Sequence, residues 1–361
     1  MAFEATKREW GEVQSFLRLL ADGYVCAGTP TGEACTERPY RIAVVQREEH
    51  DGTRRHLIEG DDIHIVGEKM DKRVPREYFK AAAELIANAM KRTHTDGMES
   101  PDGVEEFLDE IAVYDLEAKT DDRTDYHIGF WTVEAPLVGF RVCSRLAPMN
   151  PLLDGGRTAN LKFEQTGVKF ATPTVNKINA LESPNEVIDR MRMIDRLGGV
   201  LKYSDVADKV FRSNLSMIDL HFPRLLAEMV RTMYVEDMTR VSELTERIRE
   251  INPLKIKEEL ITKHRFYEYK MKQFLLALAL GMRPAKLFNG TDSAVEGFIM
   301  VDTEGCPVCY QKADKGTFED FLFRNTRFEK GSLEKDKYGY LERENGAYFF
   351  KLNAKIGFVK R

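Results

Sequence analysis

The stretch TDYHIGFWTVEAPLVGFRVCSRL, residues 124–146, carries the strongest structural signal in this sequence. Two runs rich in β-branched and aromatic residues, 126–133 and 138–144, are typical of strands. The segment 134–136 between them, Glu-Ala-Pro, is short enough to close a hairpin. Asp125 stands immediately before the first run. The stretch therefore predicts a β-hairpin that is opened by an acidic residue.

The second strand of this hairpin alternates between two faces. We expect Phe140 and Val142 on one face and Arg141 and Cys143 on the other. Many metal-dependent nucleases use such a frame, with an Asp at the start of one strand and an (Asp/Glu)-x-Lys triplet on the next. Two oxygen ligands hold Mg²⁺ there, and the lysine orients or activates the attacking water. Here the triplet reads Arg-Val-Cys, so the stretch alone leaves a surface Asp125 beside an amphipathic strand as the alternative.

The overall composition is that of a globular protein. Of the 361 residues, 43% are hydrophobic and 31% are charged, which excludes a largely disordered chain. Five cysteines are few for this length, as is usual in a reducing cytoplasm. No apolar run of about 20 residues is present, so we expect no transmembrane helix. The charged first 20 residues do not resemble a signal peptide. The sequence therefore predicts a cytoplasmic protein with no membrane partner.

Charge is distributed unevenly along the chain. The net charge of −5 by itself argues against a nucleic-acid partner. Segment 96–125, however, holds 12 acidic and two basic residues, whereas 139–180 holds two acidic and six basic ones. Segment 320–361 holds six acidic and ten basic residues, with aromatic side chains between them. The pattern excludes only indiscriminate coating of a polyanion and leaves a localised DNA-binding cleft open.

The chain contains four regions of different texture and no low-complexity linker or repeat, so we expect one compact unit. The regions are an N-terminal α/β region (1–95), a nuclease-like core (96–180), a helical region (181–285) and a β-rich basic C-terminal region (286–361). In the first region, PREYFKAAAELIANAMK (75–91) has apolar residues at helical spacing and a proline in its first turn, so it predicts a helix.

The CPVC motif at Cys306 and Cys309 invites a zinc or redox interpretation. A zinc ribbon needs a second CxxC or a histidine pair, and none follows in the sequence. Residues 302–305 are typical of a turn that leads into a strand. We therefore favour a structural role for both cysteines, with a metal or redox role as the alternative.

An ordered set of stretches adds to the hairpin. After Asp125 come GFRVCSRL (139–146), PLLDGG (151–156) and TANLKFEQTG (158–167). The C-terminal part contains FEDFLFRNTRFEKGSLEKDKYGYLERENGAYFFKLNAKIGF (318–358). In order and spacing these stretches resemble the HpaII family of type II restriction endonucleases over most of the chain. No single one is as specific as a nucleotide-binding loop, and the resemblance rests on the set.

The resemblance implies an α/β fold of the restriction-endonuclease (PD-(D/E)xK) type, with a mixed sheet core flanked by helices, a helical block and a β-rich C-terminal part. It implies a site-specific endodeoxyribonuclease that hydrolyses double-stranded DNA with Mg²⁺ as cofactor, at a short target that could be similar to CCGG. Such an enzyme would act in restriction-modification and phage defence, beside a cognate cytosine methyltransferase. Because a palindrome has two equal half-sites, we also expect a homodimer.

The resemblance breaks down at the catalytic motif. Asp125 matches the family's metal-binding Asp, and Ser144 matches a family serine. Arg141 stands where the family has Ser, and Cys143 stands where it has the catalytic Lys. A thiol has a pKa of about 8.5 and is soft, so it replaces neither an ammonium group nor an oxygen ligand of Mg²⁺.

Two interpretations follow from this departure. In one, Lys162 and Glu164 supply the missing cation and a carboxylate, Glu134 is a second acid and metal ligand, and Arg141 contacts the scissile phosphate. In the other, the centre is impaired or inactive, and the protein binds DNA without cutting it. His127, two residues after Asp125, would share its face of the strand as a metal ligand or a base, with a plain hairpin residue as the alternative.

The expected DNA contacts follow the hairpin and occupy the basic C-terminal segment. Arginine and asparagine side chains carry hydrogen-bonding groups suited to phosphates or base edges. The expected contacts are Ser144, Arg145, Arg157, Asn160, Arg324, Arg327, Lys330, Lys335 and Lys337.

Overall fold

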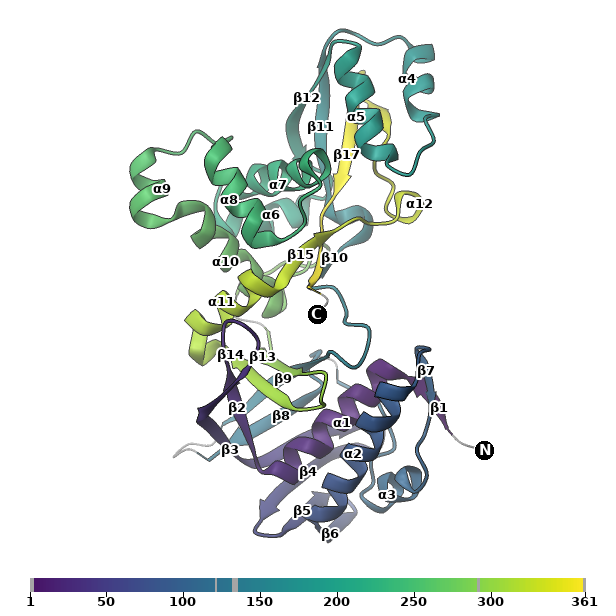
Figure 1. Ribbon diagram of the computed structural model, residues 1–361, viewed down its shortest axis with the longest axis vertical. Coiled ribbons are helices and arrows are strands. Elements are labelled where there is room, and N and C mark those ends of the chain that lie inside the picture. Colours follow the sequence, from purple (N-terminus) through teal and green to yellow (C-terminus); the bar gives the residue numbers. More distant parts are fainter. Residues whose placement is uncertain (1–2, 121, 132–135, 291–292, 360–361) are drawn as a thin grey trace. The chain divides into compact units, whose positions relative to one another are not determined.

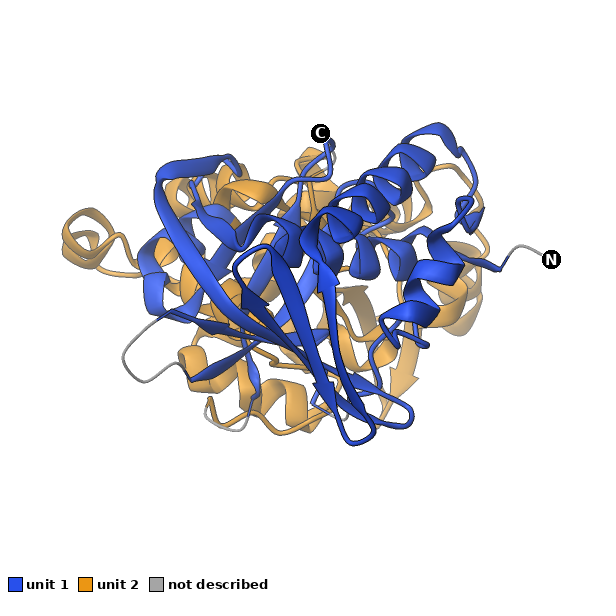
Figure 2. Cartoon of the chain, turned by 90° about the horizontal axis from the view of Figure 1, so that it is seen from below, with its two compact units in different colours: residues 1–150, 292–321 blue, residues 151–291, 322–361 orange. Residues whose placement is uncertain are grey.

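The structure of the chain is a computed structural model that describes residues 3–120, 122–131, 136–290 and 293–359. The chain divides into two compact units (Figure 2). Unit 1 contains residues 1–150 and 292–321, and unit 2 contains residues 151–291 and 322–361. Each unit is therefore built from two separate segments of the chain.

Unit 1 is a mixed sheet with helices packed on it (Figure 1). Within the described residues its main sheet has the strand order β2-β14-β13-β9-β8-β3-β4-β5-β6, and β2 also pairs with β3. The pairs β13–β9 and β14–β2 are parallel, and the other pairs are antiparallel. The strands are β2 Tyr24–Gly28, β3 Ala34–Glu49, β4 Gly52–Glu59, β5 Asp62–Gly67, β6 Met70–Pro75, β8 Tyr126–Phe130, β9 Leu137–Ser144, β13 Val295–Val301 and β14 Pro307–Gln311. This mixed sheet with flanking helices confirms the expected α/β fold class.

Two helices, α1 (Lys7–Asp22) and α2 (Arg76–Arg92), lie side by side in unit 1 (Figure 1). Helix α1 begins with a capping box. The Thr6 side chain accepts the Glu9 backbone N–H at 3.3 Å, and the Glu9 carboxylate accepts the Thr6 backbone N–H at 2.8 Å. The helix ends at Gly23, whose φ of 70° is the left-handed conformation that glycine adopts without strain.

The core of unit 1 is formed between these helices and the sheet. Apolar residues of α1 recur every three or four positions, which places them on one face of the helix. The buried contributors include Trp10, Val13, Phe16, Val45, Ile86, Ile128 and Phe140. The remaining elements of unit 1 are the antiparallel pair β1 (Glu4–Thr6) and β7 (Gly97–Glu99), α3 (Val104–Glu110) and the 3-10 turn Lys312–Asp314. Helix α11 (Lys315–Asn325) contains the border between the units.

Unit 2 contains two antiparallel sheets and a set of helices. One sheet has the order β12-β11-β17-β16, and the other has the order β10-β18-β15. The strands are β10 Leu153–Asp154, β11 Asn160–Gly167, β12 Gly199–Val206, β15 Thr326–Glu329, β16 Leu341–Glu344, β17 Ala347–Asn353 and β18 Lys355–Phe358. The helices are α4 Thr172–Asn179, α5 Glu186–Arg196, α6 Lys209–Ile218, α7 Phe222–Glu236, α8 Val241–Ile251, α9 Glu258–His264, α10 Phe266–Ala279 and α12 Leu333–Asp336, together with the 3-10 turn Gly156–Ala159.

The unit borders do not follow the four regions expected from composition. Strands β13 and β14 of the C-terminal region pair with β9 and β2 of unit 1, and thereby join the N-terminal part of the chain. Strands β15 to β18 of the same region belong to unit 2. Composition along the chain carries no information on such long-range pairing. The four-region division therefore stays a prediction about composition and periodicity.

Several local predictions are confirmed. Strands β8 and β9 form the expected antiparallel hairpin, although most of its tip, 132–135, lies outside the described residues. Helix α2 matches the helix expected at 75–91. The segment before Cys306 is a turn that leads into β14, and Cys309 is buried in that strand. The helical region, however, contains an unpredicted strand, β12, which is stabilised by its pairing with β11.

None of the helices in the described part of the chain has the length and apolar content that crossing a membrane requires.

Candidate active site

Asp125 is fixed at the start of the β8–β9 hairpin. Its backbone N–H donates to the Phe140 carbonyl at 2.8 Å, and its Oδ2 accepts the Val142 backbone N–H at 2.6 Å. Position 139 is a glycine, which lets the segment before β13 approach β9, because a Cβ there would lie only 2.3 Å from the Ala294 carbonyl oxygen. The expected position of Asp125, before the first strand and beside the second, is therefore confirmed, while its role stays a prediction.

A second carboxylate, Glu12, comes from helix α1. Its side chain is buried, and Oε1 accepts the Ala118 backbone N–H at 2.8 Å and Arg47 Nη2 at 3.2 Å. Burial, and then the charge of Asp125, raises the pKa of Glu12 to about 8. Burial likewise raises the pKa of Asp125 to about 6, against the opposing effects of the Val142 N–H and the Arg141 charge. The charge of Asp125 therefore acts on Glu12, and the two groups form a carboxyl pair.

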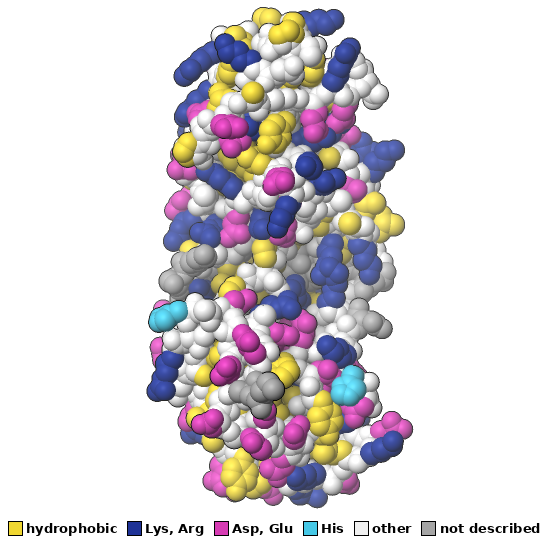
Figure 3. All heavy atoms as spheres, turned by 90° about the vertical axis from the view of Figure 1, so that its right-hand side faces the viewer, with side chains coloured by type: hydrophobic (Ala, Val, Ile, Leu, Met, Phe, Trp, Pro, Cys, Tyr) yellow, Lys and Arg dark blue, Asp and Glu magenta, His cyan; other side chains and the backbone are white. Residues whose placement is uncertain are grey.

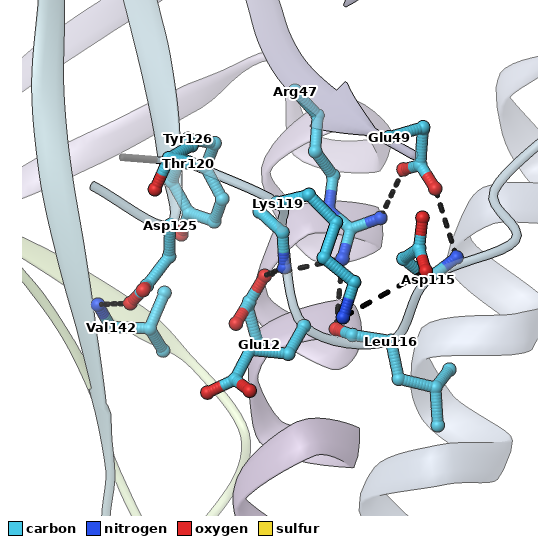
Figure 4. Close-up of polar contacts among 12 residues, drawn as sticks. Glu12, Arg47, Glu49, Asp115, Leu116, Lys119, Thr120, Asp125, Tyr126 and Val142 are labelled. Atoms are coloured by element: carbon cyan, nitrogen blue, oxygen red, sulfur yellow. Dashed lines mark hydrogen bonds and ion pairs between the residues drawn. The ribbon is translucent and has the colours of Figure 1, made fainter. Parts of the chain in front are cut away.

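A buried arginine holds the Glu12 side chain (Figure 4). Arg47 is 0% exposed and lies between Glu12 and Glu49. It forms an ion pair with each of them and donates to the Leu116 carbonyl at 2.8 Å. Glu49 Oε2 in turn accepts the backbone N–H groups of residues 114–115 at 3.0 and 2.9 Å. The network ties α1, β3 and the loop before Asp125 into one polar cluster.

The carboxyl pair suits a hard divalent cation. No hydrogen bond within the described residues engages Glu12 Oε2 or Asp125 Oδ1. Magnesium prefers carboxylate oxygens and keeps several waters, so that one or two protein carboxylates are sufficient. The described residues contain no cluster of three or more side chains that could ligate a metal. The donor set therefore fits a largely hydrated Mg²⁺ and not a metal enclosed by protein ligands.

The position of the expected lysine is occupied by a neutral thiol. Cys143 is buried, and burial raises its pKa to about 11, so it carries no charge at neutral pH. Arg141 is partly buried, lies 5.8 Å from the centre of the Phe298 ring and lowers the pKa of Asp125 by its charge. The groups that act most strongly on the carboxyl pair include arginines and no lysine.

The residues predicted to replace the lysine belong to the other unit of the chain. Lys162 and Glu164 are on strand β11 in unit 2, whereas Asp125 is in unit 1. Lys162 forms an ion pair with Glu344, and its ammonium group lies 4.5 Å from the centre of the Phe349 ring. The structure thus shows Lys162 with partners of its own. The catalytic role of Lys162 and Glu164 stays a prediction.

Two other predicted participants differ in what the structure shows. His127 is on β8, and its Nε2 lies 3.5 Å from Asp122 Oδ2. It has therefore a carboxylate neighbour of its own beside the hairpin. Glu134, predicted as the second acid and metal ligand, lies outside the described residues. Within the described residues, the charge of Asp125 acts on Glu12, and the charge of Glu117 raises the pKa of Asp125.

Two predicted DNA contacts are buried inside the fold. Ser144 is 6% exposed and accepts the Leu146 backbone N–H at 3.2 Å, next to Gly11 of α1. Asn160 is 2% exposed, and its amide is used by hydrogen bonds within unit 2. Neither side chain is available to a base or a phosphate in this structure. Sequence alone did not reveal this burial, and their role as DNA contacts stays a prediction.

The other predicted contacts retain accessible side chains. Arg327 forms an ion pair with Glu329, and Lys330 lies 3.8 Å from Asp237. Arg145 follows β9 in unit 1 and is partly buried. The predicted contacts whose side chains are exposed are Arg157, Arg324, Lys330, Lys335 and Lys337, all in unit 2.

Glu12 and Arg47 were missed by the sequence reasoning. A signal existed for Glu12, because it lies four residues before Phe16 and eight before Leu20, on the face of α1 that these residues bury. A carboxylate among such residues is unusual unless it is paired or functional. Arg47 had no comparable signal, since its strand also carries exposed charges.

The two units differ strongly in charge. Unit 1 contains 21 basic and 36 acidic residues, a net charge of −15, whereas unit 2 contains 33 basic and 23 acidic residues, a net charge of +10. Figure 3 shows the difference on one face, where Asp and Glu gather in the lower part and Lys and Arg are more frequent in the upper part. The mild overall charge is therefore an average over an acidic and a basic unit.

Comparison with known proteins relates the chain to a protein family and to a known enzyme. The model of the HpaII restriction endonuclease family matches residues 6–358. The type II restriction enzyme HpaII of Haemophilus parainfluenzae is 29% identical over 363 residues, which cover 99% of this chain and 99% of that enzyme. No solved structure matches the chain.

Proposed function

The chain belongs to the HpaII restriction endonuclease family, and on this premise we propose that it cuts duplex DNA at a short specific site with Mg²⁺ as cofactor. The carboxyl pair of Asp125 and Glu12 is the observation that carries the proposal. Two largely buried acids without a metal are costly, because burial raises the pKa of both and the charge of Asp125 raises that of Glu12 further. A bound cation would remove that cost, which supports a metal centre here.

Each residue of the site has a distinct proposed role. Asp125 and Glu12 would hold Mg²⁺, which when bound supplies positive charge for the phosphodiester under attack. Arg47 keeps the Glu12 carboxylate in place through its ion pair. Arg141 would contact the scissile phosphate, because its guanidinium is always charged and matches phosphate oxygens. The target CCGG, a homodimer and a companion cytosine methyltransferase are further parts of the proposal.

The test compares the wild type with Asp125→Asn and Glu12→Gln. We expect wild type to cut unmodified phage DNA at discrete positions with Mg²⁺ and both variants to lose at least 100-fold in rate. Thermal melting gives a readout independent of cutting, since a ligand of the folded state raises its stability. Mg²⁺ should raise the Tm of the wild type and leave that of Asp125→Asn unchanged. Undiminished cutting by Asp125→Asn would remove the site from the proposal.

A second candidate function is DNA binding without effective cleavage. The observation that favours it is the buried, neutral Cys143 in the place of the family's catalytic lysine. For this candidate we expect wild type to bind DNA in gel-shift assays without cutting it, even with Mn²⁺. Cys143→Lys should then restore cutting, and Cys143→Met, a neutral control of similar length, should not. Efficient cutting by the wild type would exclude this candidate.

A further inference from the structure

Two segments of unit 2 that carry exposed cations are joined to each other. Arg157 lies in the 3-10 turn Gly156–Ala159, Lys335 lies in α12, and Lys337 follows that helix. Arg157 Nε donates to the Lys335 carbonyl at 3.4 Å. All three side chains are exposed, and within the described residues none of them forms an ion pair. They are therefore positive charges that no carboxylate of the described residues neutralises by contact.

Beneath these cations lies a buried pair of amide side chains. Asn160 is 2% exposed and Asn353 is 1% exposed. Asn160 Nδ2 donates to the carbonyl oxygens of Asp336 at 2.8 Å and Lys337 at 3.2 Å. Asn353 Nδ2 donates to Asn160 Oδ1 and to the Gly156 carbonyl, both at 2.8 Å. The two amides thus hold the turn of Arg157 and the helix of Lys335 through their backbones.

The backbone of the segment formed by α12 and Lys337 is also closely defined. Lys337 has a φ of 51°, a left-handed conformation that is uncommon for a residue with a side chain. The Asp336 carboxylate accepts the Ser332 backbone N–H at 2.8 Å, so this acid is engaged within its own turn. Glu334 is exposed on the same short helix and is the acid of α12 that could weaken anion binding. The cations retain a local excess over it.

We infer that Arg157, Lys335 and Lys337 form one binding site for the phosphates of duplex DNA, and that Asn160 and Asn353 are positioning residues that hold its two segments together. The inference rests on the proposed function for its ligand. Phosphates are the expected ligand because unpaired, exposed cations on a unit of charge +10 attract a polyanion irrespective of base sequence. Two rigidly joined segments also lose less entropy on binding than independent loops would.

The first test removes the three positive charges of the proposed site. The control removes three positive charges from other positions in unit 2. The variant is Arg157→Gln/Lys335→Gln/Lys337→Gln. The control, Lys202→Gln/Lys255→Gln/Lys257→Gln, removes three exposed cations of unit 2 that also lack an ion pair within the described residues. Affinity for a fluorescein-labelled 30-base-pair duplex with one CCGG, and for the same duplex without it, is measured in EDTA at several KCl concentrations.

We expect the slope of log affinity against log salt to fall by about 2 to 3 in the first variant, since each phosphate contact contributes about 0.9. The loss should be equal for both duplexes, and the control should keep the wild-type slope. An unchanged slope in the first variant, or an equal loss in the control, would overturn the inference.

The second test separates positioning from stability. Asn353→Ala is made in the wild type and in the triple glutamine variant, and folding of each is checked by thermal melting. If Asn353 is a positioning residue, its substitution should weaken DNA binding about tenfold in the wild type. The same substitution should have little effect where the three cations are already absent. Equal weakening in both backgrounds would show a purely structural role. Should Asn353→Ala not fold, Asn160→Ser is tested in the same two backgrounds.

Failure of this inference can be told apart from failure of the proposed function. If wild type binds and cuts DNA but the triple variant keeps the wild-type salt dependence, only the phosphate site is wrong. If wild type shows no salt-dependent affinity for either duplex, the proposed function fails and the phosphate site fails with it.

Discussion

His56 shows at the scale of one residue how the sheet of unit 1 limits the acid stability of the protein. Its imidazole is fully buried on β4, with its ring edge-on to Phe16 at 4.8 Å between centres. Burial lowers its pKa to about 3, well below the ordinary histidine value of 6.5. The protonated form is therefore favoured in the unfolded chain, and stability is lost as the pH falls below about 6.5.

We predict that His56→Phe removes this part of the pH dependence. Between pH 7.5 and 5.5 the wild type should lose about 1.4 kcal/mol more unfolding free energy than the variant, because only its unfolded state gains the proton at this position. Urea unfolding at the two pH values measures the difference, and the other titrating groups cancel in the comparison. An identical pH dependence in both proteins would contradict the prediction.

At the scale of elements, Arg47 connects α1, β3 and the loop that precedes Asp125. It is fully buried with two carboxylates as partners, so its removal leaves two acids without a cation in a dry environment. We predict that Arg47→Met lowers the unfolding free energy by about 3 to 5 kcal/mol. Urea unfolding at pH 9, where Glu12 with its pKa of about 8 is ionised, gives the measurement.

The matched control for this prediction is Arg47→Met combined with Glu12→Gln and Glu49→Gln. Neutral amides need no cation, so the combined variant should recover much of the lost stability. If it is as unstable as Arg47→Met alone, lost packing and not uncompensated charge determines the effect.

At the scale of the whole molecule, the two units differ in net charge. With −15 on unit 1 and +10 on unit 2, phosphates should be attracted mainly to unit 2. We predict that bound duplex DNA protects the lysines of unit 2 from acetylation several-fold more, on average, than those of unit 1. Mass spectrometry after acetylation with and without DNA measures the protection at each lysine. Equal average protection in both units would show that net charge does not direct binding.

Much of the local structure and part of the site could be predicted from the sequence. The β8–β9 hairpin with Asp125 at its start, the helix α2 and the turn before Cys306 follow from patterns of neighbouring residues. Such patterns depend on strand alternation, helical spacing and turn residues, which are local properties of the chain. The ordered stretches around Asp125 and at 318–358 also identified the family from the sequence alone.

Only the tertiary structure decided which distant groups act together. The pairing of Glu12 with Asp125, the burial of Arg47 and the use of Asn160 inside unit 2 all depend on contacts between residues far apart in the chain. The division into an acidic and a basic unit likewise depends on β13 and β14 joining the first 150 residues. The physical reason is that burial and electrostatic coupling belong to a residue's surroundings in space, whereas composition and periodicity describe only its neighbours along the chain.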